Sequence, residues 1–241
     1  MELNVLYESF QGEVNRFGIG SPTLFLRLQG CHIRCYKRTL GHLCDTPESL
    51  KKPIGKTEIS SIFVGVEKLS KKTGIKVVTL TGGDPLWNSA EEVETLLKGL
   101  TDRGFYVSIE TSGTLSWVPF VNISNNISWV IDYKLKSAGI KNGLEFFSDE
   151  EHLNVLTEND FIKFVVYDEE DYEEMVKAVY TLHEKTKAKL AVGSYWGGKI
   201  PTIGLFQKLS QDKLLGKVVM NMQTHKMAFS SDYSNRIPIK L

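Results

Sequence analysis

The chain has 241 residues, which suits one domain with a substantial core, and its 41% hydrophobic and 24% charged residues are ordinary for a globular protein. Lysine plus arginine equals aspartate plus glutamate at 29 each, so no overall positive field favours nucleic acid or an anionic membrane. The first residues lack the basic and apolar regions of a signal peptide, and no apolar run reaches membrane-spanning length. We therefore expect a cytoplasmic protein that contacts neither a membrane nor nucleic acid directly.

Strand-like and helix-like segments alternate along the chain. Strands are predicted at residues 23–28, 76–81, 106–110, 129–134, 161–166, 189–193 and 218–222. Helices are predicted at residues 57–73, 89–103, 169–187 and 202–215. Such alternation indicates a parallel sheet covered by helices, and periodicity alone leaves open whether the sheet is doubly wound or closes partway into a barrel. Because no linker or repeat is evident, residues 1–241 are expected to form a single domain.

Polar or glycine-rich segments follow four of the predicted strands. They cover residues 31–44, 82–85, 110–113 and 132–134. The loops that follow parallel strands lie at one edge of the sheet, where α/β folds keep their active sites. We therefore expect these four segments to meet at one site.

The only cysteines are Cys31, Cys35 and Cys44. An odd, clustered set is a poor disulfide framework and favours metal or redox chemistry. Three thiolates can hold a [4Fe–4S] cluster with one iron left open, and the amine and carboxylate of S-adenosylmethionine (SAM) can chelate that iron. A structural zinc site with His32 or His42 as the fourth ligand is an alternative. Three ordinary small hydrophobic residues are another, although the loop is polar.

These segments resemble the 7-carboxy-7-deazaguanine synthases, a family of radical SAM enzymes. The matching segments, in chain order, are residues 9–13, 20–28, 30–35, 44–46, 81–86, 110–114, 134, 163–166 and 223–226. The sequence departs from the family pattern in four places. Eight residues separate Cys35 from Cys44, Val14 replaces a glycine, Asp132-Tyr133 stands where Ser-Pro often precedes Lys134, and residues 230–241 match nothing.

The resemblance implies a modified partial (β/α) barrel of the radical SAM type, with parallel strands and flanking helices. It implies a lyase that converts 6-carboxy-5,6,7,8-tetrahydropterin to 7-carboxy-7-deazaguanine with loss of ammonia, in the biosynthesis of queuosine-type 7-deazapurines. The implied cofactors are a [4Fe–4S] cluster, SAM and Mg²⁺, with the reduced cluster cleaving SAM to a 5′-deoxyadenosyl radical. The implied partners are a pterin substrate, a reductant resembling flavodoxin or ferredoxin, and a second copy of the chain in a homodimer.

The resemblance also implies roles for individual residues, with no catalytic group beyond the cluster and SAM. Cys31, Cys35 and Cys44 would hold the cluster and Thr46 the Mg²⁺ ion. The residues expected to contact SAM are Leu43, Asp45, Gly82, Gly83, Glu110, Ser112, Asp132 and Lys134. The residues expected to contact the substrate are Phe10, Gln11, Gly12, Glu13, Arg27, Thr81 and His225. Among these, the guanidinium of Arg27 suits a carboxylate, and Gln11 with Glu13 suits the edge of a pterin ring.

Each role has a structural alternative. Arg27 fits an exposed strand edge, Gln11 and Glu13 a solvated turn, Thr46 a helix cap, and His225 a purely structural contact. Two other functions also stay open: an activase that installs a glycyl radical on a partner protein, which residues 132–134 favour, and a non-catalytic zinc-binding protein.

Overall fold

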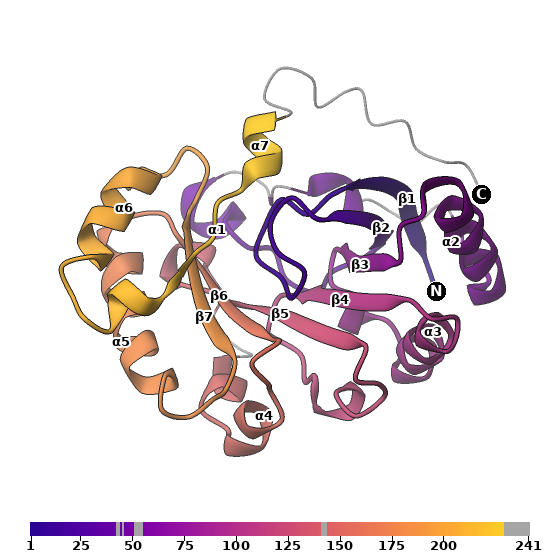
Figure 1. The fold of residues 1–241 in the computed structure, drawn as a ribbon. Coiled ribbons are helices and arrows are strands. Elements are labelled where there is room, and N and C mark those ends of the chain that lie inside the picture. Colours follow the sequence, from indigo (N-terminus) through magenta and orange to yellow (C-terminus); the bar gives the residue numbers. More distant parts are fainter. Residues whose placement is uncertain (42–43, 45, 51–54, 141–143, 229–241) are drawn as a thin grey trace.

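The computed structural model describes residues 1–41, 44, 46–50, 55–140 and 144–228 (Figure 1). The described strands form one sheet in the order β1 to β8, without a reversal. They are β1 (Leu3–Phe10), β2 (Pro22–Leu28), β3 (Val77–Gly82), β4 (Tyr106–Thr111), β5 (Ile127–Tyr133), β6 (Phe161–Val166), β7 (Lys189–Ser194) and β8 (Val219–Met220). β1 pairs antiparallel with β2, and every later pair is parallel.

The strand order decides between the two predicted architectures. A doubly wound sheet reverses its strand order at a switch point, and this sheet does not. A constant order with right-handed crossovers curls the sheet in one direction, and in the described residues β1 and β8 remain unpaired edges. The fold is thus the predicted α/β partial barrel, open between its first and last strands.

The helices lie mainly along the outer side of the curved sheet (Figure 1). They are α1 (Lys37–Leu40), α2 (Ile59–Thr73), α3 (Ala90–Asp102), α4 (Glu150–Asn154), α5 (Glu169–Leu182), α6 (Thr202–Leu209) and α7 (Thr224–Ala228). Short 3₁₀ turns occur at Pro47–Leu50, Pro85–Trp87, Val118–Phe120, Lys136–Ala138, Leu144–Phe147 and Leu215–Lys217. No helix among these described residues is both long and apolar enough to cross a bilayer.

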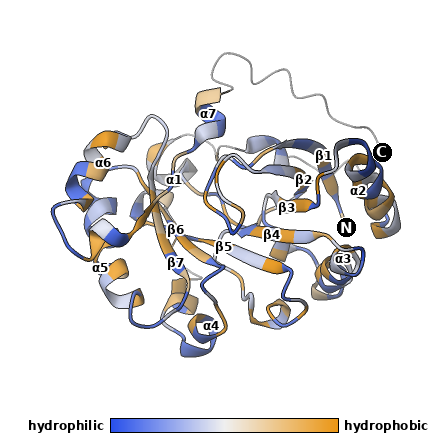
Figure 2. Cartoon of the chain, in the orientation of Figure 1, coloured by the Kyte–Doolittle hydropathy of each residue, from blue (hydrophilic) through white to orange (hydrophobic). Residues whose placement is uncertain are grey.

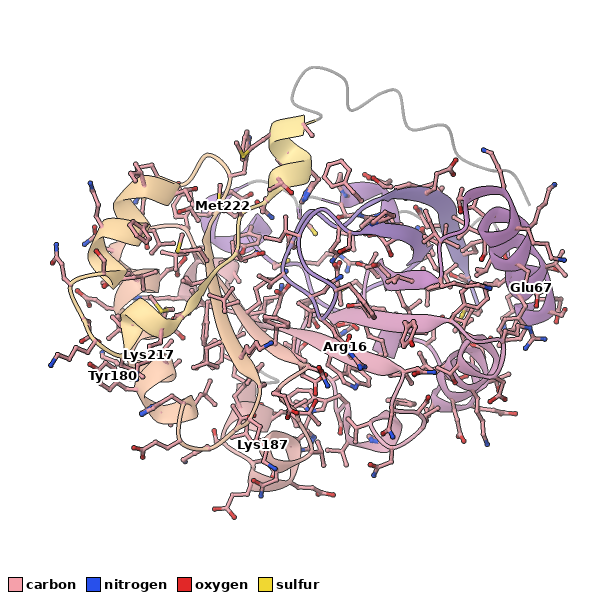
Figure 3. All side chains as sticks on the ribbon, in the orientation of Figure 1. Arg16, Glu67, Tyr180, Lys187, Lys217 and Met222 are labelled. Carbon is pink, nitrogen blue, oxygen red and sulfur yellow. The ribbon has the colours of Figure 1, made fainter. Side chains whose placement is uncertain are left out.

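The longer helices α2, α3, α5 and α6 each bury apolar residues on one face. In α3 these residues are Val93, Leu96, Leu97 and Leu100, and the Ser89 hydroxyl caps the helix by accepting from the Glu92 amide. Figure 2 shows apolar colours concentrated on the strands and polar colours on the outer loops and helix surfaces. Outward-facing side chains such as Glu67, Tyr180 and Lys187 lie at the periphery (Figure 3). The concave side of the sheet is thereby left to the loops.

All seven predicted strands are present, and the differences lie at the ends of elements. The helix predicted for 169–187 ends at Leu182, its last buried apolar residue, because residues 183–187 offer nothing apolar to the core. The helix predicted for 202–215 ends at Leu209, and the Asp212 carboxylate then accepts from the Leu214 and Leu215 amides to start a new turn. β1 and the short helices α1, α4 and α7 were not predicted, and residues of β1 and α7 contribute to the site.

Candidate active site

A pocket opens at the carboxyl ends of the strands, where the four polar segments were predicted to meet. The residues with predicted roles that line it are Phe10, Gly12, Glu13, Arg27, Cys31, Cys35, Cys44, Thr46, Thr81, Gly82, Gly83, Glu110, Ser112, Asp132, Lys134 and His225. Gln11 lies behind the pocket lining, where its side-chain Nε2 atom donates to Glu110 Oε1 at 3.1 Å. Leu43 and Asp45 fall outside the described residues. The fold therefore brings residues from position 10 to position 225 into one cavity.

The three cysteines line this pocket together, and no disulfide joins them. In the described part of the chain, no three His, Cys, Asp or Glu side chains converge closely enough to hold a single metal ion. One zinc ion requires its ligands to meet at one point, whereas an iron–sulfur cluster distributes its thiolates over several irons. Three thiols around one cavity therefore suit a cluster, and His42, one of the two predicted fourth zinc ligands, lies outside the described residues.

The loop that carries the cysteines is held close to the sheet. The Gly30 amide donates to the Ser49 carbonyl at 2.8 Å, and the Tyr36 amide donates to the Ala138 carbonyl at 2.9 Å. Burial raises the pKa of the Cys31 thiol to about 11, with nearby Asp84 and Cys35 adding to the effect and the Ile33 amide opposing it. At neutral pH this thiol keeps its proton until a metal centre displaces it.

Asp84 joins the loops that follow β3 and β4. Its carboxylate accepts from Thr111 Oγ1 at 2.9 Å, from the Ser112 amide at 3.1 Å and from the Leu86 amide at 3.0 Å. The Ser112 hydroxyl also donates to Asp84 and lies 2.7 Å from Thr114 Oγ1. Ser112 therefore supports the loops, and its predicted contact with SAM stays a prediction.

Gly82 and Gly83 allow a close approach between two backbone segments. Gly82 has φ +131°, and a Cβ on either glycine would overlap backbone atoms, of Leu28 for Gly82 and of Gly30 for Gly83. The Gly83 amide donates to the Leu28 carbonyl at 3.2 Å. The structure thus gives this pair a tight-turn role, and their predicted contact with SAM stays a prediction.

Arg27 extends from β2 into the pocket rather than out to solvent. Its Nε atom donates to the Tyr7 hydroxyl at 3.2 Å, and its guanidinium carbon lies 5.7 Å from the centre of the Phe25 ring. Tyr7 and Phe25 stack with ring centres 5.3 Å apart. The guanidinium is thus supported by two rings at the pocket wall, where it can bind a planar carboxylate.

Glu13 belongs to a chain of buried ion pairs. Its carboxylate contacts Lys163 Nζ and accepts from Gln223 Nε2 at 2.7 Å. Lys163 also lies 3.0 Å from Asp132 Oδ1, and Asp132 Oδ2 is 2.7 Å from Lys134 Nζ. Burial alone would raise the pKa of the Asp132 carboxyl, but Lys134 and Lys163 outweigh it and lower the pKa. The predicted substrate and SAM sides of the pocket are thus connected by alternating charges.

Glu110 lies among the residues predicted to bind substrate. It accepts from Gln11, whose Oε1 atom accepts from Thr79 Oγ1 at 3.1 Å. Burial raises the pKa of the Glu110 carboxyl, and nearby Glu13 adds to the effect while Lys163 opposes it. Its predicted contact with SAM stays a prediction, and its hydrogen bond with Gln11 places it beside a residue predicted to bind substrate.

His225 lies in the first turn of α7 and packs on Gly12. A Cβ at Gly12 would overlap the imidazole ring, and the Thr224 amide donates to the Gly12 carbonyl at 2.9 Å.

Thr46 lines the pocket and also supports the following turn, because its carbonyl accepts from Ser49 Oγ at 2.7 Å. For His225 and Thr46 alike, these structural contacts are compatible with the predicted binding of substrate and of Mg²⁺.

The pocket also contains residues that the sequence analysis gave no role. Among them are Tyr7, Lys163, Tyr195 and Gln223. Lys163 was detectable, because a lysine inside the apolar run of 161–166 is a buried charge that needs partners. The others carried no local signal.

The chain resembles known proteins over most of its length. No model of a known protein family matches it. It is 31% identical to the 7-carboxy-7-deazaguanine synthase of Clostridium acetobutylicum over 88% of this chain and 89% of that protein. It is 32% identical to the synthase of Methanospirillum hungatei over 82% of this chain and 74% of that protein.

Solved structures show the same fold. The crystal structure of QueE from Escherichia coli matches with a TM-score of 0.64 at 21% identity, over 92% of each chain. That of Streptococcus suis SuiB matches with a TM-score of 0.50 at 16% identity, over 70% of this chain and 38% of the other. From its sequence relatives, the chain belongs to the 7-carboxy-7-deazaguanine synthase family of radical SAM proteins.

Proposed function

We propose that this chain is a lyase that converts 6-carboxy-5,6,7,8-tetrahydropterin to 7-carboxy-7-deazaguanine. The observation that carries the proposal is that Arg27 and Glu13 face the same pocket as the three cysteines. Arg27 is suited to the substrate carboxylate, and Glu13 to the N–H donors at the other end of the ring. The reaction releases one ring nitrogen as ammonia and consumes no net oxidant, because SAM is re-formed.

Cys31, Cys35 and Cys44 would hold the [4Fe–4S] cluster, as the arrangement of their thiols around the pocket supports. When bound and reduced, the cluster supplies the electron that cleaves SAM into the radical that starts the reaction. Thr46 would contribute an oxygen ligand to Mg²⁺, with substrate and water supplying the others.

The chain's own residues bind and orient the substrate. Tyr7 and Phe25 support Arg27, which fixes one end of the substrate. Glu13 fixes the other end, so the ring has one orientation relative to the cysteines. Glu110 lines the pocket and can accept or return a proton during loss of ammonia, and Gln11 orients it by donating to its Oε1 atom.

The proposal is tested by an anaerobic turnover assay with reconstituted protein, dithionite, SAM, Mg²⁺ and 6-carboxytetrahydropterin. We expect 7-carboxy-7-deazaguanine in the products by mass spectrometry, with no net loss of SAM. Formation of 5′-deoxyadenosine without that product would keep the radical SAM assignment and reject this substrate. A cluster-loaded protein that gives neither product, beside an active relative, would reject the proposed activity.

Three further expectations accompany this proposal. We propose that a flavodoxin or ferredoxin supplies the electron, which replacing dithionite by each protein in the same assay would test. We propose a homodimer, which light scattering of the loaded protein would test. We also propose that residues 1–241 unfold as a single domain, which one coincident transition by fluorescence and circular dichroism would support.

A further inference from the structure

Lys163 is a buried cation without a role in the reaction as proposed above. It lies on β6, where its neighbours are apolar, and its side chain is only 8% exposed. Burial of an amine disfavours its charge, yet the pKa of Lys163 is raised because Asp132, Glu13 and Glu110 surround it. The positive charge that these three carboxylates stabilise is expected to stabilise their ionised forms as well.

Glu13 is the carboxylate that Lys163 contacts most closely. Its Oε1 atom accepts from Gln223 Nε2, and its Oε2 atom accepts from Lys163 and, at 3.5 Å, from Asn221 Nδ2. A carboxylate has about four acceptor positions, so these three donors leave capacity for one more. Because Glu13 lines the pocket, that capacity is available to a ligand.

The charges around Glu13 come from four elements. Lys163 on β6 and His225 on α7 favour its ionised form, whereas Asp132 on β5 and Glu110 on β4 carry like charge. Burial raises the pKa of the Glu13 carboxyl, but Lys163, with smaller effects from Gln223 and His225, lowers it to about 2. Without Lys163, a buried carboxyl beside two other acids takes up a proton much more readily.

We propose that Lys163 is a positioning residue that holds Glu13 as a fixed carboxylate, so that the pocket selects ring edges that present N–H donors. The inference deepens the proposed function and rests on it. A protonated Glu13 loses acceptor capacity and gains a donor, which reverses the pattern that a pterin edge requires. Lys163 thereby makes binding of this edge independent of pH across the neutral range.

The test measures binding of 6-carboxypterin, an oxidised relative of the substrate with the same carboxylate and amino edge, by its own fluorescence. Cluster-loaded protein with SAM would be titrated anaerobically between about pH 5.5 and 7.5. The variants are Lys163→Gln, Lys163→Arg and Glu13→Gln. Lys72→Gln is the matched control, because Lys72 forms an exposed ion pair with Glu8 at 3.2 Å outside the pocket.

The wild type and Lys72→Gln are expected to bind with a dissociation constant that changes less than about twofold over this range. In Lys163→Gln, the affinity should fall about tenfold from the upper to the lower pH, as Glu13 takes up a proton. Lys163→Arg should restore the flat profile, and Glu13→Gln should bind weakly at every pH. A flat profile in Lys163→Gln would overturn the inference, whatever its absolute affinity.

If circular dichroism shows that Lys163→Gln does not fold, the inference is tested instead by comparing the binding of two ligands. The wild type should prefer 6-carboxypterin over 6-carboxylumazine, whose ring carries oxygen in place of the amino group, and Glu13→Gln should lose that preference. Equal preference in both proteins would overturn the inference. A wild type that binds neither compound would instead reject the proposed substrate class, which is a separate failure.

Discussion

The Tyr7 hydroxyl accepts a hydrogen bond from Arg27 Nε at 3.2 Å, across the antiparallel pair of β1 and β2. This contact restrains the side chain that is proposed to bind the substrate carboxylate. It exists only because the first strand of the chain runs beside the second. The N-terminal strand therefore supports the proposed substrate-binding side chain as well as the sheet.

Removal of this hydroxyl should weaken substrate binding without affecting chemistry. Tyr7→Phe is expected to raise KM for the pterin about twofold to tenfold, the usual net value of one hydrogen bond, with kcat nearly unchanged. Tyr180→Phe is the matched control, because its hydroxyl donates to Asp212 at 2.6 Å on the outer surface (Figure 3). Steady-state kinetics of the three proteins would check this, and an equal KM in all three would contradict it.

Loss of one cysteine should remove the cluster. Cys44→Ala is expected to lose the iron–sulfur absorbance after anaerobic reconstitution, because two thiolates hold a [4Fe–4S] cluster poorly. His32→Gln tests the neighbouring side chain, whose Nε2 atom lies 3.0 Å from Thr114 Oγ1, and it should keep its iron. Iron and sulfide would be measured in each. A normal cluster in Cys44→Ala, or zinc in place of iron, would reject the ligand assignment.

A side chain at Gly83 should disturb the cysteine loop. A Cβ there would overlap the Gly30 carbonyl and lie 3.1 Å from the Cβ of Cys31, both of them close to the cluster ligands. Gly83→Ala should therefore bind less iron and lose stability. Gly204→Ala in α6 is the control, since its nearest neighbour would be 3.5 Å away and alanine stabilises a helix by about 1 kcal/mol. Equal iron content in the two variants would contradict this account.

Asp84 should contribute to stability more than its position in a loop suggests. Asp84→Ala leaves the Thr111 hydroxyl and the Ser112 amide without their acceptor, and each unsatisfied buried group costs about 1–3 kcal/mol. Asp102→Ala, at the exposed end of α3, should change stability by less than about 0.5 kcal/mol. Urea unfolding would compare them, and a small effect at Asp84 would show that the two loops are held together by other contacts.

Much of the sheet was predictable, because parallel strands buried on both sides are short apolar runs that periodicity detects. Residues 161–166 and 189–193 are clear examples. β1 was not, since its sequence LNVLYESF mixes apolar and polar residues on an edge strand that pairs with β2 alone. The choice between a doubly wound sheet and a partial barrel was also undecided, because it depends on the order of the strands in the sheet rather than on any local pattern.

The site was predictable as a set of residues but not as a set of contacts. The motifs indicated Glu13, Asp132 and Lys134, yet nothing local indicated that Lys163 lies between the first two. Ser112 was indicated as a SAM contact, and no local pattern indicated that its hydroxyl also donates to Asp84. Such pairings depend on which loops the sheet places side by side.

The two ends of the described chain close the pocket together. The Val14 amide donates to Asn221 Oδ1 at 2.9 Å, and the Thr224 amide donates to the Gly12 carbonyl. During synthesis on the ribosome, the cysteines therefore emerge long before the segment that completes the wall around them. Until residues 221–225 arrive, the nascent N-terminal loop lacks these two hydrogen bonds, so a cluster bound by the cysteines as proposed would be enclosed by this wall only after they have emerged.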